Sequence, residues 1–199
     1  MKKIISIILI AVSLLLLPSC IADCSYDEAE VKAAATDLIK RAEVYNDIFW
    51  GKGIPYIEDN SYSNGIYYAA DPDYIHNMGF KNLDDIYLKA STVYSADYLE
   101  SIYIGMNTNG NVRYYQGVEY IMVNSKHTPL LVDEVKYLYD TLEILGYDGE
   151  VMCIKITVKV TRGEDTQTRD REIDLVKEGG RWLLDSPTYT SYRPTSVQK

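Results

Sequence analysis

The chain has 199 residues and a formal net charge of −9 at neutral pH, with 29 acidic residues against 20 basic ones. This balance argues against a nucleic-acid-binding protein, because phosphates demand a basic face. It also argues against broad contact with anionic lipid or anionic wall polymer, whereas a basic protein partner or an uncharged ligand is compatible with it.

The N-terminal residues have the pattern of a secretory signal peptide. Lys2 and Lys3 form a basic start, and residues 4–17 follow without a charge. A basic start, a short apolar run and small residues at a cut site are typical of such signals. The run is too short for a comfortable membrane span, which needs roughly 20 residues. We therefore expect residues 1–19 to be removed.

Residues Leu17-Pro18-Ser19-Cys20 resemble the bacterial lipobox, in which a diacylglycerol is added to the cysteine and the chain is cut before it. Leu17 and Ser19 fit this pattern, whereas Pro18 is less usual. The alternative is ordinary secretion with cleavage near Cys20. At roughly 0.8 kcal/mol per buried methylene, two acyl chains hold a domain at a membrane, whereas one does not. The resemblance implies an extracytoplasmic protein anchored through Cys20, with residues 20–24 as a short tether.

A long first helix is predicted to run to about Trp50. Ser25 and Glu28 have the spacing of a capping box, with Ser25 as N-cap. One apolar stripe at helical spacing comprises Val31, Ala34, Ala35, Leu38, Ala42, Tyr45 and Phe49. Gly51 and Gly53 are expected to end the helix.

Glycine and proline then punctuate residues 52–80, which predicts a structured loop region with a short strand at residues 66–68. Asn82 and Ser95 are expected to cap two further helices. After Gly110 the apolar period changes from about 3.6 to 2. This change predicts strands at residues 113–123 (with a possible kink at Gly117), 151–161, 167–177 and 181–185. Residues 135–145 satisfy both helical and strand spacing.

This order of elements predicts an α+β domain over residues 25–190, with N-terminal helices packed on one face of a curved antiparallel sheet. We expect a loose tail over residues 191–199.

Three stretches, residues 45–53, 82–99 and 174–187, resemble the nuclear-transport-factor-2-like (cystatin-like cone) superfamily. The likeness is closest to uncharacterised lipoproteins of Gram-positive bacteria and looser to the IseA-type inhibitors of cell-wall DL-endopeptidases. It implies a cone-like sheet and a strand over residues 137–145. It specifies a fold and not a reaction, because no catalytic set of the superfamily maps onto this chain.

Tyrosine is heavily used, with 19 Tyr against 2 Phe. Tyrosine supplies rigid amphipathic surface suited to sugars or peptides, although many rings can instead fill a core with their hydroxyls at its edge. The candidate contact surface comprises Tyr45, Phe49, Trp50, Tyr67 and Tyr68. The alternative interpretation of these residues is a hydrophobic plug that closes the base of the core. Trp182 is expected to lie in the core.

Few residues suggest chemistry. His76 and His127 lie in predicted loops without a nucleophile signature. Asp71-Pro72-Asp73 is typical of a turn and Asp84-Asp85 of a helix start, and a calcium site needs more oxygen ligands. The sequence has no glycine-rich phosphate loop, paired-cysteine zinc motif or nucleophile elbow. We therefore predict no catalytic residue, metal ligand or cofactor.

Cys24 and Cys153 could pair outside the cell, but a half-buried packing role for Cys153 is favoured. The leading hypothesis is a membrane-anchored, non-catalytic binding or regulatory module. Its partner would be an envelope protein such as a cell-wall hydrolase, or a wall-derived ligand. The alternative is a small-molecule binder or enzyme that uses an enclosed cone pocket.

Overall fold

The computed structural model describes residues 25–50, 53–62, 67–107, 112–115, 118–122 and 134–190. The helices are α2 (Glu28–Trp50), α3 (Pro72–Asn77), α4 (Leu83–Ala90) and α5 (Ala96–Asn107). The strands are β1 (Tyr56–Tyr62), β2 (Tyr67–Ala70), β3 (Val112–Tyr115), β4 (Val118–Met122), β5 (Glu134–Tyr147), β6 (Val151–Arg162), β7 (Asp165–Glu178) and β8 (Arg181–Leu184). The predicted α+β class, with antiparallel strands, is confirmed.

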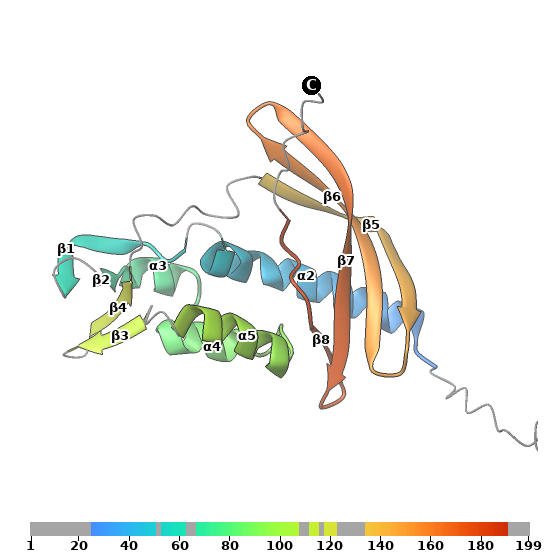
Figure 1. Cartoon of the computed structure of the whole chain (residues 1–199), viewed down its shortest axis with the longest axis horizontal. Coiled ribbons are helices and arrows are strands. Elements are labelled where there is room, and N and C mark those ends of the chain that lie inside the picture. Colours follow the sequence, from blue (N-terminus) through green and yellow to red (C-terminus); the bar gives the residue numbers. More distant parts are fainter. Residues whose placement is uncertain are drawn as a thin grey trace, which may run out of the picture.

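The strands form two antiparallel sheets. The small sheet has the order β1-β2-β4-β3, and the long sheet has the order β5-β6-β7-β8. Figure 1 shows the two sheets at opposite ends of the molecule, with α2 running from the long sheet toward the small one. The predicted simple order, helices first and one sheet afterwards, is therefore wrong, because β1 and β2 precede three of the helices.

The core lies between α2 and the inner face of the long sheet. On β6 the inner residues are fully buried, while Lys155, Thr157 and Lys159 lie on the opposite face, as a period of 2 requires. The buried residues of β6 are Met152, Ile154, Ile156, Val158 and Val160. From α2 they meet Val31, Ala35, Leu38, Ile39 and Ala42. The predicted faces of this strand are confirmed.

A different residue from the one predicted caps α2. The Asp27 carboxylate accepts hydrogen bonds from the backbone N–H groups of Ala29 (2.8 Å) and Glu30 (3.2 Å). A side-chain acceptor placed immediately before the first helical residue satisfies N–H groups that have no partner inside the helix. The predicted N-cap at Ser25 is therefore wrong. The predicted end of the helix at Trp50 is confirmed.

The predicted strand over residues 137–145 is confirmed, and it contains a bulge. The pairing of β5 with β6 moves from Leu138↔Thr157 to Glu143↔Lys155, so β5 carries additional residues between these pairs. The Thr141 hydroxyl accepts a hydrogen bond from the Thr157 N–H (2.9 Å) and donates one to the Leu138 carbonyl (2.7 Å). The side chain thus replaces ladder partners that the bulge removes.

The predicted caps of α4 and α5 are confirmed. The Asn82 side chain accepts from the Asp85 N–H (2.8 Å), and the Ser95 hydroxyl accepts from the Tyr98 N–H (3.0 Å). Between these helices the Val93 carbonyl accepts a hydrogen bond from the Leu184 N–H (2.9 Å). The Ser95 backbone N–H donates one to the Leu184 carbonyl (2.8 Å). These bonds join the helical segment to β8, the edge strand of the long sheet.

Two regions differ from their predictions. In the region 52–80, β2 confirms the predicted short strand at residues 66–68, whereas β1 and α3 were not predicted. Residues 113–123 were predicted as one strand, but β3 and β4 pair antiparallel with each other, from Val112↔Ile121 to Tyr115↔Val118. A glycine between two alternating runs is compatible with a hairpin as well as with a kink. Gly117 itself lies outside the described residues.

The ionisation of Asp85 should make the free energy of unfolding depend on pH. Its carboxylate accepts a hydrogen bond from the Lys81 N–H (2.9 Å) and forms an ion pair with Lys89 (3.2 Å). The hydrogen bond from the Lys81 backbone is the main reason that the pKa of Asp85 lies below its usual value. A depressed pKa in the folded state stabilises the fold above the unfolded pKa of about 3.9, and this contribution is lost as the pH falls through the folded pKa.

We expect Asp85→Asn to lower the midpoint of urea unfolding at pH 7. The difference from wild type should shrink as the pH falls below the unfolded pKa of about 3.9 and through the lower folded pKa. Asp84→Asn, on the exposed side of the same helical turn, is the matched control. An Asp85→Asn deficit that is the same at pH 7 and pH 2 would contradict this assignment.

Candidate functional site

The structure divides the five predicted aromatic residues into two groups. Tyr45 stacks on Phe49 at 6.0 Å and Phe49 contacts Trp50, whereas Tyr67 and Tyr68 lie on β2. Tyr45 is buried in the core, where its ring lies 6.0 Å from the rings of both Phe80 and Tyr94. Tyr67 and Tyr68 belong to β2 and contact rings of β1, with Tyr62 at 6.4 Å and Tyr56 at 4.9 Å. Phe49 and Trp50 lie at the C-terminal end of α2.

Trp50 forms a stacked pair with a residue that the sequence did not single out. The rings of Trp50 and Tyr189 are 4.5 Å apart with an interplanar angle of 26°. Phe49 lies edge-on to Trp50 at 5.6 Å. All three rings are half-buried, so each keeps part of its surface open to solvent.

Tyr189 belongs to residues 185–190, the segment that follows β8. Hydrogen bonds hold this segment against the long sheet. The Arg171 guanidinium donates through Nε (3.1 Å) and Nη2 (2.6 Å) to the Pro187 carbonyl. The Tyr137 hydroxyl donates to the Thr188 carbonyl (3.1 Å). Asp185 donates its N–H to the Asp174 carbonyl (2.8 Å).

A buried polar pair joins the same segment to α2. The Asn46 amide nitrogen lies 2.9 Å from Thr188 Oγ1, and this hydroxyl lies 3.3 Å from Asn46 Oδ1. Asn46 is 5% exposed and Thr188 is fully buried. Buried polar groups of this kind are costly unless they are paired, so the pair favours one position of the segment on α2.

The inner face of β7 changes from apolar to polar along the strand. Ile173 and Leu175 are buried in the core. Further along, Arg171 lies opposite Ile156, Arg169 opposite Val158 and Gln167 opposite Val160. Residues directly opposite each other in an antiparallel pair share a face. These three polar side chains therefore lie on the inner face, where they are half-buried.

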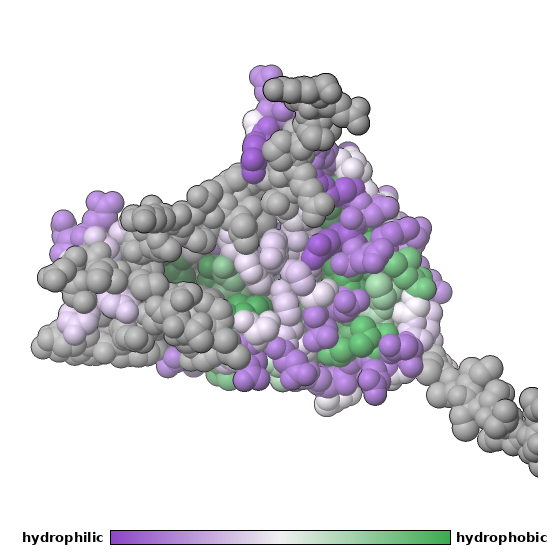
Figure 2. All heavy atoms as spheres, in the orientation of Figure 1, coloured by the Kyte–Doolittle hydropathy of each residue, from purple (hydrophilic) through white to green (hydrophobic). Residues whose placement is uncertain are grey.

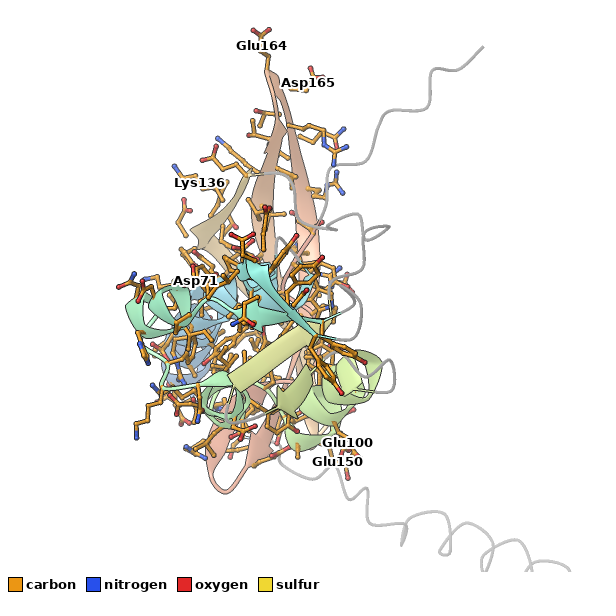
Figure 3. All side chains as sticks on the ribbon, turned by 90° about the vertical axis from the view of Figure 1, so that its left-hand side faces the viewer. Asp71, Glu100, Lys136, Glu150, Glu164 and Asp165 are labelled. Carbon is orange, nitrogen blue, oxygen red and sulfur yellow. The ribbon has the colours of Figure 1, made fainter. Side chains whose placement is uncertain are left out.

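This end of the long sheet also reverses the charge balance of the chain. Residues 155–171 contain five basic and three acidic residues, although the whole chain is strongly acidic. Figure 3 shows the strands rising here above the small sheet, to the turn marked by Glu164 and Asp165. Sequence reasoning missed Arg169 and Arg171, because residues 166–172 are polar on both faces of the strand.

Tyrosine hydroxyls complete the site. Burial raises the pKa of Tyr98, and the nearby Tyr189 phenol raises it further, while the Arg171 guanidinium opposes the shift. Burial also raises the pKa of Tyr137 to about 12. Both phenols are therefore neutral at pH 7 and can donate hydrogen bonds. We call the set Trp50, Tyr98, Arg169, Arg171 and Tyr189 the aromatic–arginine surface.

Figure 2 shows the hydropathy of the region around residues 185–190. Pale described residues of intermediate hydropathy lie in the middle of the view, where Figure 1 places residues 185–190, and strongly polar residues border them on the long sheet. Tyrosine, tryptophan and threonine have such intermediate hydropathy. The Tyr189 ring that stacks on Trp50 lies two residues along the chain from the carbonyl that Arg171 holds.

The remaining candidates have structural surroundings. His76 is exposed on α3 rather than in the predicted loop, and His127 lies outside the described residues. The Asp71 carboxylate caps α3 by accepting from the N–H groups of Asp73 (2.9 Å) and Tyr74 (3.3 Å), so this predicted turn begins a helix. Within the described ranges, no group of three or more His, Cys, Asp or Glu side chains is arranged to hold a metal ion.

Cys153 is half-buried, as predicted, and forms no disulfide within the described part of the chain. Burial raises its pKa, and the neighbouring Asp174 carboxylate raises it further, so the thiol is protonated at neutral pH. Cys20 and Cys24 lie outside the described residues, as do the predicted signal peptide and the tail at residues 191–199.

None of the helices in the described part of the chain is both long enough and apolar enough to cross a bilayer. Comparison with models of known protein families found no family that matches this chain, and comparison with curated proteins found no match either.

Proposed function

We propose that this chain is an extracytoplasmic lipoprotein, anchored by acyl chains on Cys20, whose domain is a non-catalytic binding module for a wall-derived glycan. The basic start, the apolar run and the lipobox-like residues support the anchor. The short tether would keep the domain close to the membrane and to the wall material above it.

The observation that carries the binding role is the stacked pair of Trp50 and Tyr189. Partly exposed Trp and Tyr rings supply rigid, amphipathic contact area with little entropy to lose on binding. One ring projects from the end of a long helix, and the other belongs to a segment held by Arg171, Tyr137 and the buried Asn46–Thr188 pair. The site is thus preorganised, which lowers the cost of binding.

We further propose that the long sheet and α2 are the cone-like unit of the nuclear-transport-factor-2-like superfamily, with a looser likeness to IseA-type inhibitors. Two features support this fold. Register shifts in β5 are bulges, which bend a strand, and α2 packs against the inner face of the sheet.

An enclosed pocket for a small molecule or an enzyme reaction is the alternative function. The inner face along β6 is occupied by fully buried apolar side chains that pack against α2. A ligand there would have to displace core residues, at a cost of about 2–5 kcal/mol for each large side chain. We therefore place the ligand at the polar end of the inner face, beside Trp50.

The test is binding of the wall disaccharide N-acetylglucosaminyl-N-acetylmuramic acid to the full chain in detergent, measured by isothermal titration calorimetry. We expect Trp50→Ala to weaken binding about tenfold or more, because a central aromatic contact is lost. Tyr56→Ala removes an exposed ring of the small sheet and serves as the matched control. A loss of affinity in Tyr56→Ala but not in Trp50→Ala would refute this location.

A further inference from the structure

Arg169 and Arg171, on the inner face of β7, indicate which charge the ligand of this surface should carry. We propose that the aromatic–arginine surface recognises a carboxylate on the sugar ring of its ligand, with Arg171 and Arg169 as the cationic partners. This inference rests on the proposed function and narrows its ligand to an acidic amino sugar.

The geometry of Arg171 suits such a group. Its Nε and Nη2 atoms hold the Pro187 carbonyl, which fixes the plane of the guanidinium. A guanidinium has five N–H donors in a rigid fork, and these two bonds use one side of it. The remaining edge, formed by Nη1 and the second N–H of Nη2, has the spacing that binds the two oxygens of a carboxylate.

The second guanidinium is placed by the strand. Arg169 lies two residues from Arg171 on the same inner face, and its Nη2 donates to the Gln167 side-chain oxygen. Both cations are half-buried, so a carboxylate between them is screened less than it would be on an open surface.

Charge favours a single carboxylate over a polyanion. The chain as a whole is strongly acidic and repels extended anionic polymers, whereas residues 155–171 are locally basic. The stacked rings of Trp50 and Tyr189 offer a flat apolar face to the C–H side of a pyranose. A sugar ring with one carboxylate substituent therefore matches both parts of the surface.

Two disaccharides differ only in the lactyl ether that carries such a carboxylate. N-acetylglucosaminyl-N-acetylmuramic acid carries a lactyl carboxylate that N,N′-diacetylchitobiose lacks. We expect the full chain in detergent to bind the first about tenfold more tightly at low ionic strength. We expect this preference to shrink in 0.5 M salt, because salt screens partly exposed charges.

Arg171→Gln is expected to reduce the preference to within about twofold. Since this variant also loses the bonds to Pro187, Arg169→Gln provides a second variant that keeps them, and it is expected to reduce the preference at least threefold. Arg181→Gln, exposed at the start of β8, is the matched control and should keep the full preference. Near-ultraviolet circular dichroism checks the fold of each variant.

The outcomes separate the two proposals. Equal affinity of wild type for both disaccharides, or an unchanged preference in Arg169→Gln, overturns the carboxylate site and leaves glycan binding intact. Absence of binding to either disaccharide overturns the proposed glycan-binding function itself. A preference that falls in Arg169→Gln but not in Arg181→Gln supports the site, even if Arg171→Gln does not fold.

Discussion

Replacing Ile154 with alanine is expected to lower the free energy of unfolding by about 3 kcal/mol, within the usual range of about 2–5 kcal/mol for such a core truncation. Ile154 is fully buried on β6, which lies between β5 and β7, and it pairs with Ile144 and Ile173 on the same inner face. Its neighbours belong to paired strands, so they cannot move to fill the cavity. The cost should therefore include both lost burial and the remaining void.

The adjacent residue provides the control for this prediction. Lys155 lies on the outer face and pairs with Glu143 at 2.8 Å, with side chains 30% and 61% exposed. Ion pairs with this exposure contribute about 0–1 kcal/mol, so Lys155→Ala should cost under about 1 kcal/mol. Urea unfolding followed by circular dichroism measures both variants. Equal midpoints would show that β6 does not have the inner and outer faces described above.

The alternation of apolar and polar residues predicted β6 well because the surroundings of each face stay the same along the whole strand. One face meets α2 and the other meets solvent, so apolar and polar residues alternate from Met152 to Val160. The neighbouring strand β5 was ambiguous for an equally physical reason. Its bulge shifts the inner positions from Val135 and Tyr137 to Leu142 and Ile144, and the resulting mixture of spacings imitates a helix.

The small sheet could not be predicted in this way. Every residue of β1 is exposed, so no apolar alternation marks the strand. Its neighbour β2 has only four residues and pairs with β4, where Tyr68 lies opposite Ile121. Partners so far apart in the chain leave no local pattern, and short strands offer too few positions for a period to be recognised.

The candidate site was predicted in part. The end of the apolar stripe indicated Trp50 because a large ring at a helix terminus meets the edge of the core. Its partner Tyr189 follows the last strand, where no periodicity remains. The inward direction of Arg169 and Arg171 depends on the register with β6, which a polar stretch of sequence does not specify.

The anchor at Cys20 predicts an all-or-none result. When cells are grown with labelled palmitate, we expect the wild-type chain to incorporate label and Cys20→Ala to incorporate none, because the diacylglycerol requires that thiol. Cys24→Ala is the matched control, since it removes a thiol only four residues away and should keep full labelling. Mass analysis of the wild-type product should find a modified cysteine at its N-terminus. Equal labelling of the Cys20→Ala variant, or an unmodified Met1 on the native product, would contradict the anchor and the extracytoplasmic placement inferred from it.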